Sequence, residues 1–122
     1  MKYKIMYIFI PLFFTLSLNA YAEYKTSDFT EEEYQMVMKA SGDYRNCLNK
    51  TAISQTESQN DVRVIADYAM KECATILETL YQNLVSANYD PEAVRKLVGS
   101  TSNRASNKLL SSLMRYMASP NR

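Results

Sequence analysis

Residues 47–73 read CLNKTAISQTESQNDVRVIADYAMKEC and contain both cysteines of the chain. Asn60 lies equally far from Cys47 and Cys73, within a polar run at residues 54–61. A reversal of the chain near Asn60 therefore brings the two sulfur atoms to the same height on two antiparallel helices. A disulfide requires Cα atoms about 4.4–6.8 Å apart, closer than the usual 8–10 Å between helix axes. We therefore expect a Cys47–Cys73 bond directly on the seam between the helices.

The apolar residues on both sides of this reversal predict the same helical hairpin. Before it, apolar residues recur at three- and four-residue steps over residues 34–52. After it, a wider apolar stripe covers residues 62–85, and its width predicts neighbours on more than one side. Antiparallel pairing about Asn60 also brings apolar residues to face one another. Tyr44 is expected to face Ile76, Ala40 to face Leu80, and Val37 to lie near Leu84.

Capping residues indicate where the helices begin. Thr30, followed by Glu33, predicts the start of the first helix. Polar residues 58–61 precede the second helix in the same way. Asp90 and Pro91 fit the cap and the first turn of a third helix.

Gly99 is expected to end this third helix, with residues 100–103 as a loop before the next one. A last amphipathic helix then runs to about Ala118, where Ser119 and Pro120 stop it. The predicted fold is all-α: a disulfide-pinned antiparallel helical hairpin, with a short third helix and a C-terminal amphipathic helix packed on it. This arrangement is a small four-helix bundle.

The first 22 residues have the pattern of a signal peptide. A positive start at residues 1–4 precedes an apolar run at residues 5–18, and Ala20 and Ala22 supply the small residues of a cleavage site. The apolar part is shorter than the roughly 20 residues of a membrane-spanning helix. We expect cleavage after Ala22, which leaves residues 23–122 as a single all-α domain. The protein is then periplasmic or secreted, where a disulfide is stable.

The residue inventory argues against catalysis. The chain has no histidine and only two glycines. It therefore lacks the commonest general base, the commonest zinc ligand and the material for a phosphate-binding glycine loop. We predict no catalytic residue, no metal site and no cofactor.

Charge is divided unevenly along the chain. Residues 23–90 carry 6 basic and 12 acidic groups, whereas residues 91–122 carry 6 basic groups and 1 acidic group. The simplest explanation is that the C-terminal part packs on the rest. The alternative is that Arg104, Lys108 and Arg115 form a basic surface for an anionic partner. Such a surface also permits contact with a membrane, whereas an exported chain of nearly neutral net charge is not expected to bind nucleic acid.

By elimination, the protein acts by binding. We expect a small exported protein-binding module of the inhibitor, immunity or assembly-factor type, whose partner is another protein in the periplasm or outside the cell. Tyr24 and Tyr89, at a terminus and in a loop, are candidate contact residues together with the three basic residues above. A homodimer could instead bury the surplus apolar width of the second helix.

Two alternatives belong to other functional classes. One is a periplasmic holding chaperone that exposes apolar helix faces under stress. The other is a copper carrier with thioether ligands, although two of its methionines point to different faces of a helix. The candidate ligands are Met36, Met38, Met114 and Met117.

Overall fold

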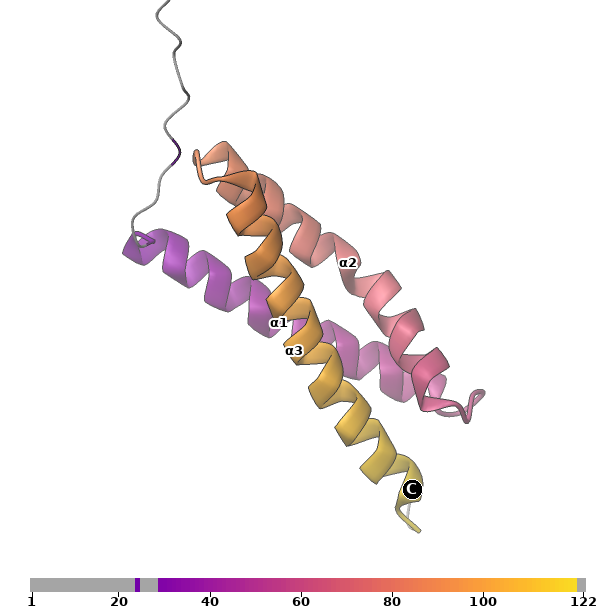
Figure 1. The fold of residues 1–122 in the computed structure, drawn as a ribbon. Coiled ribbons are helices and arrows are strands. Elements are labelled where there is room, and N and C mark those ends of the chain that lie inside the picture. The colour runs from indigo at the N-terminus through magenta and orange to yellow at the C-terminus, as the bar shows by residue number, and fades with distance from the viewer. Residues whose placement is uncertain (1–23, 25–28, 121–122) are drawn as a thin grey trace, which may run out of the picture.

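The computed structural model describes residue 24 and residues 29–120. This part of the chain forms three α-helices and no β-strand: α1 (Glu31–Gln55), α2 (Val62–Ser86) and α3 (Pro91–Ala118). Figure 1 shows that α2 runs back along α1, and that α3 reverses again and crosses α1. The predicted all-α class is confirmed, whereas the predicted signal peptide at residues 1–22 lies outside the described residues.

Each helix begins at the capping residue that the sequence indicates. The side chains of these capping residues accept hydrogen bonds from backbone N–H groups that have no partner inside the helix. The three bonds are Glu33 N to Thr30 Oγ1 at 3.2 Å, Arg63 N to the Asp61 carboxylate at 2.9 Å, and Glu92 N to the Asp90 carboxylate at 3.3 Å.

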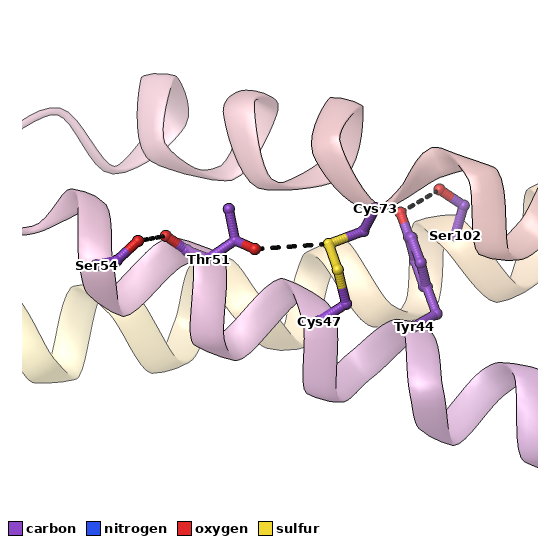
Figure 2. Close-up of a disulfide and its surroundings, with 6 residues drawn as sticks. All are labelled: Tyr44, Cys47, Thr51, Ser54, Cys73 and Ser102. Carbon is purple, nitrogen blue, oxygen red and sulfur yellow. Dashed lines mark hydrogen bonds between the residues drawn. A yellow bond between two sulfur atoms is a disulfide. The ribbon is translucent and has the colours of Figure 1, made fainter.

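The disulfide lies where the symmetric reversal predicts it. Cys47 of α1 is bonded to Cys73 of α2, with their Cα atoms 5.9 Å apart (Figure 2). On α1, the Thr51 hydroxyl lies 3.7 Å from the Cys73 sulfur. One turn before Cys47, the Tyr44 hydroxyl is 3.3 Å from the Ser102 hydroxyl of α3. The same stretch of α1 is therefore joined covalently to α2 and by a hydrogen bond to α3.

The hydrophobic core has two parts along the bundle. One surrounds the disulfide and includes Tyr44 and Ile76. The other lies near the turn between α2 and α3 and includes the remaining facing pairs, Ala40 with Leu80 and Val37 with Leu84. The two residues of each predicted pair thus belong to the same core cluster. Val98 of α3 packs against both clusters and connects them.

The prediction of a fourth helix is wrong, because α3 continues through Gly99 and residues 100–103. No described glycine has a positive φ, so Gly99 does not adopt the left-handed conformation that ends helices. A helical glycine costs only about 1 kcal/mol against alanine. The buried residues of α3 lie on one face of the helix both before and after Gly99. The free energy gained by burying them outweighs the cost of the glycine. The buried residues are Val94, Ala105, Ser106, Leu109 and Leu113.

The turn between α2 and α3 is a Schellman motif that the sequence reading did not identify. Asn88 has a φ of 71°, the left-handed conformation that asparagine tolerates better than most residues. The N–H of Asn88 donates to the carbonyl of Val85 at 3.0 Å, and the N–H of Tyr89 donates to that of Leu84 at 3.2 Å. Tyr89 and Leu84 also share the second core cluster, which is the apolar contact typical of this motif.

Candidate protein-binding surface

The seam between α1 and α3 has the least extensive helix contact of the described bundle, since each of these helices contacts α2 more extensively. Two depressions of about 210 Å³ and 300 Å³ follow one another along this seam. We call them together the α1–α3 groove. The first is lined by Met38, Ser41, Arg45, Thr101, Arg104, Ala105 and Lys108, and the second by Asn49, Ala52, Ile53, Leu109, Ser112, Leu113 and Tyr116.

The first depression is basic. Arg45 from α1 and Arg104 and Lys108 from α3 line it, and all three are exposed. No carboxylate lines this depression. The three cations therefore repel one another, and α3 does not owe its position to charge pairing here.

The ion pairs of the described residues lie elsewhere. Lys39 pairs with Asp43 at 2.6 Å, and Arg95 pairs with Glu92. Each of these pairs lies within a single helix, so neither joins α3 to the rest of the molecule. The uneven charge of the sequence is thus not explained by salt bridges between α3 and the acidic helices in the described part of the chain.

The second depression is apolar and is lined by residues of the same two helices that come later in each. Ile53 is 53% exposed and Tyr116 is 40% exposed, although both line a concave surface. Met38, in the first depression, is 49% exposed. Large apolar side chains in a concave, solvent-exposed surface are typical of interaction sites.

The structure brings two of the predicted partner-binding residues together and separates the others. Arg104 and Lys108 line the groove, one helical turn apart. Arg115 is exposed on α3, seven residues after Lys108 and thus on the same face of the helix. Tyr24 is 45% exposed but is not among the residues that line the groove.

Tyr89 is not a surface residue, contrary to its expected role as a contact in a loop. It is only 7% exposed and packs edge-on against Phe29, with ring centroids 5.1 Å apart. Its hydroxyl donates a hydrogen bond to the Glu33 carboxylate of α1. The Schellman motif described above turns this side chain into the second core cluster, where it links the α2–α3 turn to the start of α1.

Arg45 is the basic groove residue that the sequence analysis missed, and the apolar groove residues Ile53 and Tyr116 were missed as well. Arg45 follows the buried Tyr44, and its position on α1 gives no sign of which neighbour it faces. Only the position of α3 makes it a partner of Arg104 and Lys108. The signal available in the sequence was its spacing from Met38 and Ser41, which places all three on one face of α1.

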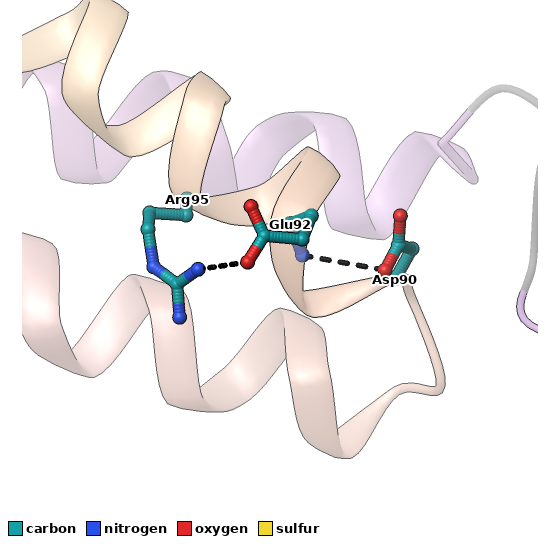
Figure 3. A network of polar contacts seen from close by, with 3 residues as sticks. All are labelled: Asp90, Glu92 and Arg95. Atoms are coloured by element: carbon teal, nitrogen blue, oxygen red, sulfur yellow. Dashed lines mark hydrogen bonds and ion pairs between the residues drawn. The ribbon is translucent and has the colours of Figure 1, made fainter.

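A larger depression of about 500 Å³ lies between α2 and α3, with Tyr44 of α1 in its lining. Its walls are mostly apolar, and its lining includes both Glu78 and Arg95. Figure 3 shows Arg95 paired with Glu92, one turn after the Asp90 cap. The hydrogen bond to Glu92, then the charge of that carboxylate, raises the pKa of Arg95 above its already high value. Charges of both signs favour no single class of ligand at this surface.

The methionines proposed as copper ligands do not share one site on α1. Met36 lines a depression on the α2 side of the helix, and Met38 lines the groove on the α3 side. Separately, no group of three or more His, Cys, Asp or Glu side chains in the described residues could hold a metal ion.

Among the described helices, none combines the length and the apolar character that crossing a membrane requires. Comparison of the chain with models of protein families, with curated proteins and with solved structures finds no match.

Proposed function

We propose that this protein is a small, exported, non-catalytic protein-binding module of the inhibitor, immunity or assembly-factor type, and that it binds its partner through the α1–α3 groove. The observation that carries this proposal is that three unpaired cations and exposed apolar side chains line two depressions between the same pair of helices. Arg45, Arg104 and Lys108 supply the charge, and Met38, Ile53 and Tyr116 supply the apolar area.

The energetics of the bundle support a binding role for these residues. Like charges held close together without counter-ions destabilise the folded chain slightly, and exposed apolar groups contribute nothing to the core. A protein partner that buries both gains from each of them. The Cys47–Cys73 disulfide is compatible with an oxidising compartment, which suits a partner in the periplasm or outside the cell.

Affinity capture with a matched pair of charge reversals tests this proposal. The full exported chain is immobilised and exposed to a periplasmic extract and to culture medium, and captured proteins are identified by mass spectrometry. The test variant is Arg104→Glu/Lys108→Glu. The control is Arg63→Glu/Lys71→Glu, which makes the same change in charge at exposed positions of α2 outside the groove. We expect a partner that the wild type and the control enrich and the groove variant does not.

Equal capture by both variants would place the binding surface elsewhere, and repeated failure to enrich any protein would contradict a binding module. The copper-carrier alternative predicts tight binding of Cu(I) by the reduced apo-protein in a titration. The chaperone alternative predicts suppressed aggregation of unrelated client proteins at low pH. N-terminal sequencing of the exported protein tests the expected cleavage after Ala22, which retention of Met1 would refute.

A further inference from the structure

We propose that the α1–α3 groove binds an acidic amphipathic helix of a partner protein. This inference rests on the proposed function and adds the shape and charge of the partner segment. The groove then acts as a helix-binding site in which the partner's apolar side chains lie between α1 and α3 and its carboxylates meet the basic residues.

The basic residues of the groove determine that the partner segment is negatively charged. Arg45 and Arg104 come from different helices and flank the same depression together with Lys108, so an occupant meets cations from both sides. No acidic side chain lines either depression. Guanidinium groups pair readily with carboxylates in two-point geometry, and such pairs direct association and fix its register.

The length and form of the groove favour a helix over a flat surface or a small molecule. The residues of α3 that line the two depressions extend from Thr101 to Tyr116, and the 15 helical rises between these residues span about 22 Å. The small side chains of Ser41, Ala105 and Ser112 leave room for a partner helix to approach α1 and α3 closely. An occupying helix of about four turns would present apolar residues at three- and four-residue steps to the exposed Ile53 and Tyr116.

A second copy of this chain is the other source of a helix, and only α2 in the described part has an outer face of the required kind. The acidic first turn, Glu31 to Glu33, belongs to α1, whose apolar face is already buried in both core clusters. The core-facing side of α2 is likewise buried, but its outer face exposes Val64 and Tyr68, at 48% and 43%, beside the exposed Asp67 and Glu72. Two exposed apolar side chains on α2 are few for a stripe about four turns long, so we assign the partner helix to another protein. Self-association of the chain that depends on Arg104 and Lys108, measured by sedimentation equilibrium, would contradict this assignment.

A membrane surface fits the groove less well than a helix does. A bilayer would rest on the ridges of α1 and α3 and leave the concave apolar lining uncovered. The chain also has no tryptophan, the residue most typical of membrane interfaces. We therefore treat binding to an anionic membrane as the outcome that would overturn the proposal.

Two synthetic helical peptides of about 18 residues, long enough to fill the groove as a helix, test the charge and shape of the occupant. Both carry the same apolar stripe, and their remaining positions are glutamate in one and lysine in the other. Fluorescence anisotropy measures their binding to the full exported chain at roughly 0.05 M and 0.5 M salt. We expect the glutamate peptide to bind about tenfold or more tightly than the lysine peptide, with a smaller difference at high salt.

Variants locate the binding in the groove. Arg104→Glu/Lys108→Glu should reverse the preference between the two peptides, while Arg63→Glu/Lys71→Glu should leave it within about twofold of wild type. Ile53→Ser should weaken both peptides equally, because it removes an apolar contact and no charge. Circular dichroism of each variant verifies that the helices form.

Three results would overturn the inference. One is equal affinity of the wild type for both peptides, and another is an unchanged preference in Arg104→Glu/Lys108→Glu. The third is binding to phosphatidylcholine vesicles with about one third phosphatidylglycerol that the glutamate peptide does not displace. If affinity capture still yields a protein that depends on Arg104 and Lys108 while the peptide fails, the proposed function stands and the helical form of the partner is wrong.

Discussion

Gly42 lies in the middle of α1, and no neighbouring atom requires a glycine at this position. A Cβ added there meets no heavy atom within 4 Å, and its φ is not positive. The close helix contact that a mid-helix glycine often permits is therefore absent at this position. Glycine in a helix costs about 0.5–1 kcal/mol relative to alanine through its entropy in the unfolded chain.

We predict that Gly42→Ala stabilises the protein by about 0.5–1 kcal/mol and raises its Tm by several degrees. Thermal unfolding followed by circular dichroism measures the effect. Gly99→Ala is the matched comparison, because a Cβ there also meets no heavy atom within 4 Å. A lower Tm for Gly42→Ala would show that another molecule or a different conformation needs the space.

The Tyr44 side chain is 1% exposed and ends in a hydroxyl 3.3 Å from the Ser102 hydroxyl. We predict that Tyr44→Phe and Ser102→Ala each destabilise the protein by about 0.5–1.5 kcal/mol. In the double variant the second change should cost less than it does alone, because the hydrogen bond is already lost. Urea unfolding of the four proteins gives the coupling energy. A coupling near zero would mean that this bond does not hold α3 to α1.

At the scale of the element, α3 is the main departure from the sequence-based expectation. Its 28 residues form one helix where a short helix, a loop and a second helix were expected. Within it, the Thr101 hydroxyl donates to the carbonyl of Leu97 at 2.9 Å, and the Ser106 hydroxyl donates to that of Asn103 at 3.1 Å. Hydroxyl groups that usually favour loops are thus bonded to the helix itself.

We predict that Thr101→Pro destabilises the protein by about 3 kcal/mol or more, because proline removes a hydrogen bond and clashes inside a continuous helix. Thr101→Ala is the control, since it removes the hydroxyl and retains the backbone N–H. Urea unfolding compares the two variants. A cost near that of the alanine control would favour the loop that the sequence first indicated.

At the scale of the whole molecule, the disulfide joins two helices across a separation of 26 residues. In the chain-entropy model, closing a loop of this length stabilises the fold by roughly 3–4 kcal/mol. We predict that reduction of the wild type lowers its free energy of unfolding by about that amount. Reductant should not change the free energy of unfolding of the double variant Cys47→Ala/Cys73→Ala. Chemical denaturation with and without reductant makes the comparison. Identical curves for the oxidised and reduced wild type would contradict the role given to this bond.

The sequence alone determined the features that depend on local chemistry and on spacing. The caps at Thr30, Asp61 and Asp90 follow from side-chain hydrogen bonding within a few residues. The Cys47–Cys73 bond follows from the symmetry of the reversal between two periodic stretches. The apolar pairing across the hairpin then follows from the same register.

Only the tertiary structure decided where α3 lies and what that position creates. Whether Gly99 ends a helix depends on burial gained along the whole of α3, which no local signal contains. Tyr89 enters the core because Asn88, in the turn before it, has a left-handed backbone conformation. Arg45 lies with Arg104 and Lys108 because α3 crosses that side of α1. Periodicity shows which face of a helix is apolar, but the packing of helices decides which side chains from different helices meet.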